Sequence, residues 1–137
     1  TKPQAPTPTR VISEASAATL EKMLVAVTQK GGTAESAAIN GYQVAGKTGT
    51  SEIIGGEASG GTVASFVGFL PAGLSKGKPA VAVSVVIYDP QAAIYGGDVA
   101  APVFRQVATA AMHNLGLAPD PQLVENNPTS SPSQTPS

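Results

Sequence analysis

Apolar residues recur with helical spacing near the start of the chain. The i, i+3, i+4, i+7 pattern of one buried stripe is formed by Leu20, Met23, Leu24 and Val27. Ser13 stands where an N-cap is needed, Glu14 follows it in the first turn, and Gly31-Gly32 ends the pattern. These features predict a helix over residues 14–30, followed by a short helical turn at residues 33–36.

Three segments with strand character follow, and turn residues separate them. The predicted strands cover residues 42–52, 62–70 and 80–88; Asn40-Gly41 marks a turn before the first, and Pro71 closes the second. The third is nearly all apolar, which is typical of a strand that is central or covered on both faces. We expect a mobile, glycine-rich loop at residues 53–61 and a hairpin connection at residues 72–79.

A second long helix is predicted over about residues 99–115, after a loop that contains Gly96-Gly97. Its buried stripe is expected to consist of Phe104, Val107, Ala111 and Leu115. The order helix, antiparallel meander, helix is that of an α+β fold in which helices flank an antiparallel sheet. The first helix needs more than one small sheet to cover it, so we predict that the fold is incomplete and forms part of a larger one.

Composition divides the 137 residues into a foldable core and two proline-rich ends. Eight of the 12 prolines lie within residues 1–9 and 118–137, whereas all 15 glycines lie between Gly31 and Gly116. We expect an extended leader at residues 1–10 that is an interior loop of the intact domain, and a folded segment at residues 11–117. A disordered tail rich in Pro, Ser and Thr is expected at residues 118–137.

Charge and residue usage exclude several classes of function. A net charge of −1 without a basic block argues against nucleic acid as a partner. The absence of cysteine excludes zinc ribbons, disulfide scaffolds and thiol catalysis, and a single histidine, His113, excludes a histidine-based metal cluster. The longest apolar run, residues 80–88, is too short to span a bilayer. We expect neither a metal nor a cofactor.

The segment with the most chemistry is Gly46-Lys47-Thr48-Gly49-Thr50, on the first predicted strand. It offers one cation and two hydroxyls within four positions, and the alternation of side chains along a strand puts Lys47 and Thr48 on opposite sides. Because Gly49 has no Cβ, an extended ligand can lie against the strand and pair with its backbone. An exposed N–H at Thr50 could then point at a carbonyl oxygen of that ligand.

The short Lys-Thr-Gly-Thr string gains meaning from the blocks around it. Gly31-Gly32-Thr33-Ala34 precedes it, and Ser-Phe-Val-Gly-Phe-Leu-Pro at 65–71, Tyr-Gly-Gly at 95–97 and Ala-Ala-Pro-Val-Phe at 100–104 follow in order. Together with residues 41–50, these blocks resemble the C-terminal part of the penicillin-binding transpeptidases, the serine acyl-enzymes that cross-link peptidoglycan. The resemblance covers residues 11–117, and the last two blocks are similar to the monofunctional class B branch.

The resemblance implies a role for each residue of the strand, because Lys47-Thr48-Gly49 matches the third active-site motif of the family. The Lys47 ammonium would assist proton transfer at a neighbouring serine-containing motif and attract an anionic substrate. Thr48 and Thr50, with Gly49 between them, would bind the carboxylate of a D-alanyl-D-alanine stem peptide or of a β-lactam. The Thr50 N–H would supply half of the oxyanion hole. The expected catalytic residues are therefore Lys47 and Thr50.

The nucleophile motif of the family, Ser-x-x-Lys, and its second motif, Ser-x-Asn, are expected upstream of Val11. Neither precedes the Lys-Thr-Gly strand in this chain. We therefore predict that the chain alone is inactive, and that the N-terminal remainder of the same protein carries the attacking serine. The resemblance also implies a membrane anchor outside this chain, with the domain on the extracytoplasmic face.

Two alternatives to a cell-wall transpeptidase remain open at this stage. A serine β-lactamase or β-lactam sensor shares the Lys-Thr-Gly strand, although Tyr-Gly-Gly and Ala-Ala-Pro-Val-Phe argue against it. A non-catalytic binding module of the same fold would also account for the missing serine motifs. The sequence likewise leaves open whether Tyr42 and Tyr95 line a site or only pack.

Overall fold

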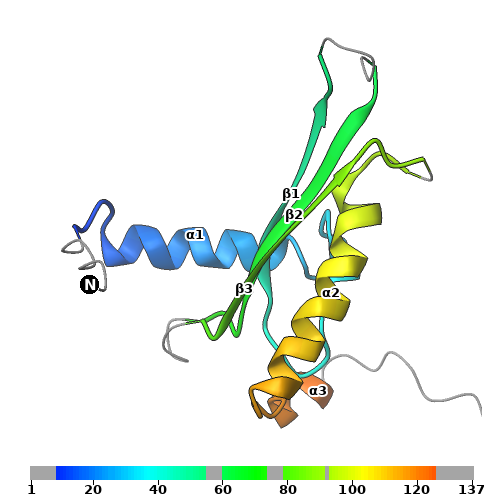
Figure 1. Cartoon of the computed structure of the whole chain (residues 1–137). Helices are drawn as coiled ribbons and strands as arrows, with labels where there is room; N and C mark the ends of the chain where they lie inside the picture. The colour runs from blue at the N-terminus through cyan, green and yellow to red at the C-terminus, as the bar shows by residue number, and fades with distance from the viewer. Residues whose placement is uncertain (1–8, 55–59, 74–78, 92, 126–137) are drawn as a thin grey trace, which may run out of the picture.

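The computed structural model describes residues 9–54, 60–73, 79–91 and 93–125, and its elements follow the predicted order. In chain order they are α1 (Glu14–Ala26), the 3-10 turn η1 (Glu35–Ala37), β1 (Ala45–Glu52), β2 (Thr62–Leu70), β3 (Val81–Tyr88), α2 (Gly96–Asn114) and α3 (Pro121–Glu125). The strands form one antiparallel sheet in the order β1-β2-β3 (Figure 1). The predicted α+β meander with flanking helices is therefore confirmed.

Helix α2 lies along one face of the sheet and forms most of the core with β2 (Figure 1). The rings of Phe66 on β2 and Phe104 on α2 pack edge to face, with centroids 4.8 Å apart. An added Cβ on Gly68 would lie 2.9 Å from the Phe104 ring, so the helix approaches β2 where that strand has no side chain. The close approach makes the core small but dense.

The buried stripe of α2 differs from the predicted one. It consists of Ala100, Ala101, Phe104, Ala108 and Met112, whereas Val107 is 47% exposed and Leu115 is exposed. Small alanines face the sheet because the helix lies so close to it, and the larger valines are turned outward. The helix also begins at Gly96, three residues before the predicted start.

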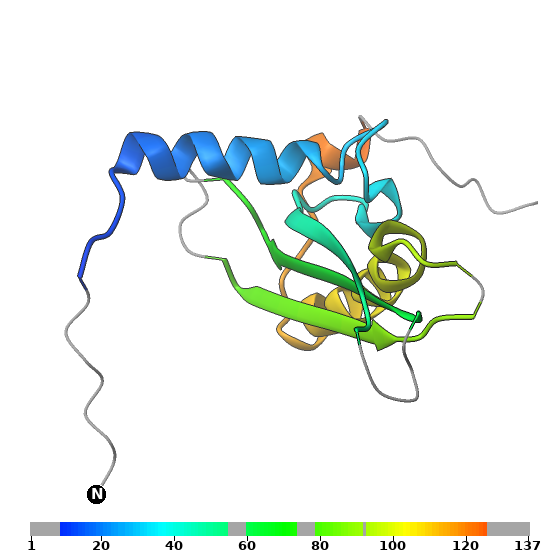
Figure 2. The ribbon, with the colours of Figure 1, turned by 90° about the horizontal axis from the view of Figure 1, so that it is seen from above.

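Helix α1 is shorter and more exposed than predicted. It ends at Ala26 rather than near residue 30, because the buried Thr28 leaves the helix and its hydroxyl donates to the Val44 carbonyl at 2.8 Å. Leu20 is 49% exposed and Met23 is 62% exposed, so the described residues leave the N-terminal half of the predicted stripe uncovered, whereas Val27 packs against the core. Figures 1 and 2 show that the N-terminal part of α1 projects away from the sheet. An uncovered apolar stripe is what the predicted incompleteness of the fold requires.

Strand β3 lies at an edge of the sheet, so the prediction that it is central or covered on both faces is wrong for the described residues. Its exposure alternates, with Val81, Val83, Val85 and Ile87 toward α2 and the residues between them exposed. The alternation follows from the period of two of a pleated strand with one face covered. The Val86 side chain is among the large apolar groups left exposed.

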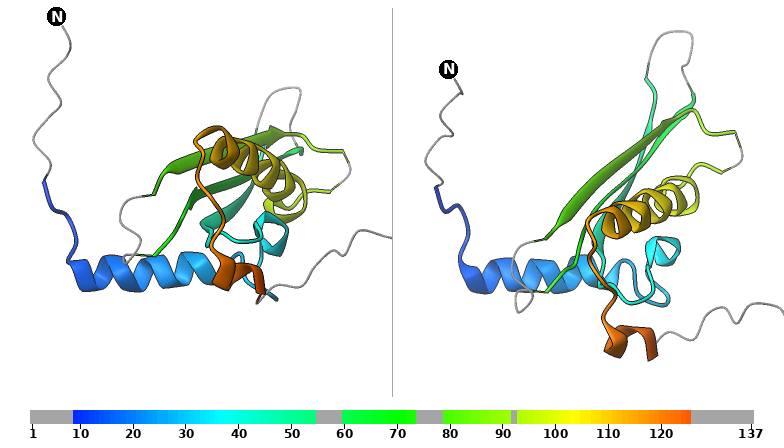
Figure 3. Two further views of the ribbon diagram at one scale, coloured as in Figure 1. Left: turned by 90° about the horizontal axis from the view of Figure 1, so that it is seen from below. Right: turned by 60° about the horizontal axis from the view of Figure 1, so that its bottom comes forward.

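The segment after α2 folds back on the turn that precedes β1 (Figure 3). The Tyr42 hydroxyl donates to the Leu117 carbonyl at 2.6 Å, and the Asp120 N–H donates to the Gly41 carbonyl at 2.7 Å. Helix α3 thus falls within the tail that composition predicts to be disordered, while residues 126–137 and the leader residues 1–8 lie outside the described residues. No helix in the described part of the chain is both long and apolar enough to cross a membrane.

Candidate active-site strand

One edge of β1 carries backbone groups, in the centre of the Lys-Thr-Gly segment, that no described strand pairs with. The Ile53 N–H donates to the Gly61 carbonyl at 2.8 Å, and with the β1–β2 register this directs the backbone of every odd-numbered residue from 45 to 53 toward β2. The N–H and C=O groups of Gly46, Thr48, Thr50 and Glu52 therefore point to the opposite side, where no described strand pairs with them. We call this side the free edge of β1.

The predicted side chains lie on both faces of β1. Lys47 lies opposite Val67 on the face away from α2, which we call the open face. Its ammonium turns to the free edge, where Nζ donates to the Thr48 carbonyl at 2.9 Å. Thr48 and Thr50 alternate with Lys47 and lie on the α2 side. The Lys47 ammonium and the outward Thr50 N–H thus meet at the free edge, while the two threonine side chains lie on the α2 face of the same strand.

The two glycines of the segment have packing reasons for their identity. An added Cβ on Gly46 would collide with the Phe66 ring, and one on Gly49 would lie 2.5 Å from the Ser65 hydroxyl on the open face. The Gly49 carbonyl accepts a long hydrogen bond from that hydroxyl, at 3.4 Å. Gly46 is therefore required by the core, and Gly49 gives room to its neighbour in β2 on the face where Lys47 lies.

The structure separates the two tyrosines that the sequence left undecided. The Tyr42 hydroxyl donates to the Leu117 carbonyl, so this side chain connects the turn before β1 to the segment after α2. Tyr95 is exposed and directly precedes Gly96, whose N–H donates to the Thr50 hydroxyl oxygen. His113 is exposed in the last turn of α2, far along that helix from Gly96.

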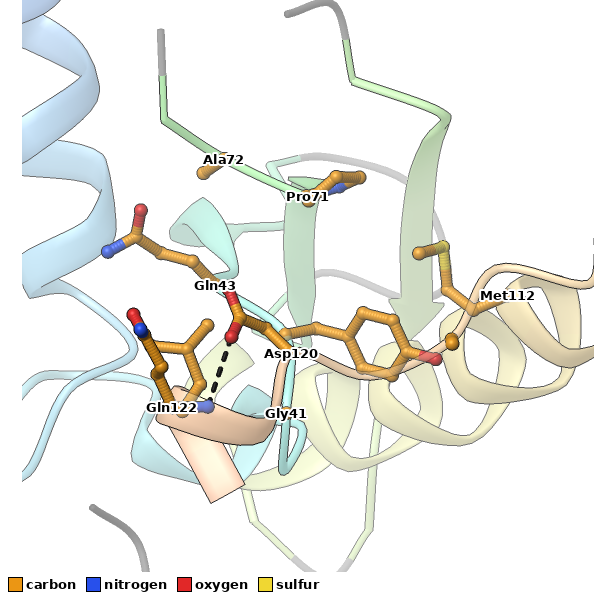
Figure 4. Close-up of a pocket in the computed structure, with 10 residues that line it drawn as sticks. Gly41, Gln43, Pro71, Ala72, Met112, Asp120 and Gln122 are labelled. Carbon is orange, nitrogen blue, oxygen red and sulfur yellow. Dashed lines mark hydrogen bonds between the residues drawn. The ribbon is translucent and has the colours of Figure 1, made fainter. Parts of the chain in front are cut away.

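A cavity of about 340 Å³ lies at the other end of β1, beyond the Lys-Thr-Gly segment. Gln43, Pro71 and Met112 line it together with the segment after α2 (Figure 4). The Asp120 carboxylate accepts from the Gln122 N–H at 3.0 Å and so begins α3. The lining includes Tyr42 but none of the residues of the Lys-Thr-Gly-Thr segment, so the cavity is separate from the free edge of β1.

Comparison with known proteins identifies the family. A family model described as penicillin binding protein transpeptidase domain matches residues 1–109. The chain belongs to this family. The probable peptidoglycan D,D-transpeptidase PenA of Neisseria flavescens is 38% identical over 118 residues, which are 84% of this chain and 28% of that protein. The peptidoglycan D,D-transpeptidase FtsI of Escherichia coli is 35% identical over 122 residues, 88% of this chain and 20% of that protein.

Solved structures give the same assignment for the fold. The apo structure of the TP domain from Burkholderia pseudomallei penicillin-binding protein 3 superposes with a TM-score of 0.70 at 34% identity. The match covers 85% of this chain and 35% of that one. The family and the partial transpeptidase fold are confirmed, and the relatives support the class B branch. This chain spans only a fifth to about a quarter of the length of the curated relatives above.

Ser75 is followed by a lysine three residues later, which is the spacing of the family's Ser-x-x-Lys nucleophile motif. Ser75-Lys76-Gly77-Lys78 reads Ser-x-x-Lys, but it follows the Lys-Thr-Gly strand, whereas the family's nucleophile motif is expected before it. The four residues lie between β2 and β3, outside the described residues. The contacts that sequence reasoning missed are tertiary: Thr28 to Val44, and Gly96 to Thr50.

Proposed function

We propose that this chain supplies one wall of the active site of a peptidoglycan D,D-transpeptidase that β-lactams inhibit. The single observation that carries the proposal is that the Lys47 ammonium and the outward Thr50 N–H share the free edge of β1, with Thr48 and Thr50 on the α2 face of the same strand. In this role an extended stem peptide ending in D-alanyl-D-alanine pairs with the free edge as an added strand. The same edge accommodates the acyl part of a β-lactam.

Each group of the strand has a task in acyl transfer. The Thr50 N–H donates to the carbonyl oxygen that becomes negative in the tetrahedral intermediate, which an amide already fixed in position stabilises without reorganisation. The Thr48 and Thr50 hydroxyls donate to the terminal carboxylate. The Lys47 ammonium attracts that carboxylate and favours loss of the proton from the attacking serine.

The serine belongs, in this proposal, to the N-terminal remainder of the protein, with the Ser-x-x-Lys and Ser-x-Asn motifs. Apolar side chains exposed in this chain support a docking surface for that remainder. Val67 is 52% exposed directly beside Lys47 on the open face, and the uncovered stripe of α1 contains Leu20 and Met23. Complete burial of a fully exposed valine, leucine or methionine side chain contributes about 1.5–3 kcal/mol. Side chains that are already half buried in this chain would contribute about half of that free energy on docking. Docking on the open face brings the serine to the side from which Lys47 approaches.

In this proposal the full-length protein acts in cell-wall synthesis on the extracytoplasmic face of the membrane. A membrane anchor outside this chain holds it there. This location follows from the substrate, because peptidoglycan is cross-linked outside the cytoplasm.

The test is acylation of the full-length protein by a fluorescent penicillin. A cation about 4 Å from a carboxylate is worth about 1 kcal/mol in water and about 4 kcal/mol near a protein surface, so Lys47→Ala lowers the acylation rate roughly 5- to 10³-fold. Lys30→Ala, which removes an exposed lysine outside β1, is the matched control and leaves the rate unchanged. Equal rates for Lys47→Ala and wild type contradict the proposal. Rapid release of hydrolysed penicillin identifies a β-lactamase instead.

A further inference from the structure

The N-terminus of α2 lies directly against β1 at Gly49 and Thr50. The Gly96 N–H donates to the Thr50 hydroxyl oxygen at 3.3 Å, somewhat longer than the usual N–H···O distance of about 2.9–3.0 Å. An added Cβ on Gly96 would collide with the Ser65 carbonyl oxygen and lie 2.8 Å from that of Gly49. Only glycine therefore allows the helix to begin this close to the strand.

The contact serves both partners. The first N–H groups of a helix have no acceptor inside it, and Tyr95, at the N-cap of α2, makes no side-chain cap. Thr50 thus supplies from another element the acceptor that Gly96 lacks. A hydroxyl has one proton and two lone pairs, and the Gly96 N–H occupies a lone pair. The Thr50 proton must then point away from Gly96, and no acceptor for it occurs among the described residues.

The first turn of α2 is also held by η1 and the residues just before it. The Ser36 hydroxyl of η1 donates to the Gly97 carbonyl at 2.6 Å. An added Cβ on Gly97 would collide with the Thr33 carbonyl oxygen. The position of the Gly96 amide relative to β1 is therefore fixed by two close-packed glycines and one strong hydrogen bond.

We propose that Gly96 is a positioning residue that presents the Thr50 hydroxyl to ligands as a hydrogen-bond donor. A carboxylate only accepts hydrogen bonds, so it binds to a threonine whose proton is directed outward. Gly96 acts through Thr50 and sets the preference of the site for ligands with a free carboxylate. The inference rests on the proposed function, because that function assigns the Thr50 hydroxyl to the ligand carboxylate.

The first experiment measures a specificity ratio in the full-length protein. The ratio is the acylation rate with a penicillin divided by that with its methyl ester, which has no carboxylate. Gly96→Ala and Thr50→Val each lower the ratio roughly 3- to 10-fold, the effect of one net hydrogen bond, and the double variant lowers it no further. Thr50→Ser, which keeps the hydroxyl, retains the wild-type ratio.

General damage to the fold gives a different result, because it slows both reactions equally. Met112→Ala is the matched control: Met112 is buried at the opposite end of α2, so its truncation destabilises the helix packing without changing the ratio. An unchanged ratio in Gly96→Ala overturns the inference. A double variant whose effect is the product of the two single effects also overturns it.

The second experiment measures hydrogen exchange of the Gly96 amide without any ligand. Exchange is faster in Thr50→Val than in wild type and stays slow in Thr50→Ser, because only valine removes the acceptor. Equal exchange in Thr50→Val and wild type overturns the inference whatever the acylation data show. A wild-type protein that does not react with penicillin contradicts the proposed function instead, so the two failures are distinguishable.

Discussion

Thr28→Val removes the hydroxyl that connects the end of α1 to the start of β1. Thr28 is 1% exposed, and its hydroxyl lies 2.8 Å from the Val44 carbonyl and 3.1 Å from the Val25 carbonyl. Val44 is itself buried and lies three residues before Lys47. The bond therefore fixes the point at which the chain enters β1, the strand that carries the proposed site residues.

The cost of the substitution follows from burial. Valine is close to threonine in shape, so the main change is the loss of the hydrogen bond and not of packing. A buried carbonyl left without a partner costs about 1–3 kcal/mol, because water does not replace the lost donor. We expect Thr28→Val to lower the free energy of unfolding by this amount. Thr28→Ser keeps the hydroxyl and is expected to lower it much less.

The assay is urea unfolding of the full-length protein, with a matched control within α1. Thr19 also donates its hydroxyl to a backbone carbonyl, that of Ala15 at 2.9 Å, but it is exposed. Water replaces the bond there, so Thr19→Val changes the free energy of unfolding by no more than about 0.5 kcal/mol. If Thr28→Val costs no more than Thr19→Val, the bond to Val44 does not carry the stability assigned to it.

Three further substitutions test other parts of the account. Gly46→Ala forces a Cβ against the Phe66 ring and lowers the unfolding free energy by about 1–3 kcal/mol; a wild-type melting temperature would contradict this packing. Tyr42→Phe removes the 2.6 Å bond to the Leu117 carbonyl, so hydrogen exchange in residues 118–125 accelerates while the sheet stays protected. Met23→Asp destabilises the full-length protein by about 2 kcal/mol or more if the α1 stripe is covered there; a neutral effect would show that it stays in solvent.

The sequence predicts the strands better than the helices. The bounds of β2 match the prediction, because Gly60-Gly61 directly precede the strand and Pro71 directly follows it. The stripe of α2 is displaced because its packing depends on Gly68, a residue far away in the sequence that lets small alanines approach β2. The apolar pattern of α1 predicts a buried stripe, but the described residues leave Leu20 and Met23 exposed.

The sequence predicts which residue types lie on the candidate site strand, but not the hydrogen bonds that their side chains make. The alternation of a strand placed Lys47 and Thr48 on opposite faces, and the register confirms it. That the lysine reaches back to the edge, and that α2 begins against Thr50, depend on contacts between segments that no local pattern encodes. The resemblance implies the roles proposed for these residues, and the fold supplies their arrangement.

The most direct test is a crystal structure of the full-length protein acylated by a penicillin. We predict that the acyl carbonyl oxygen lies within about 3.2 Å of the Thr50 nitrogen, and that the carboxylate contacts the Thr48 or Thr50 hydroxyl. The serine that carries the adduct is expected to come from outside this chain. An adduct that lies away from the free edge of β1, with Lys47 in bulk solvent, would contradict the account.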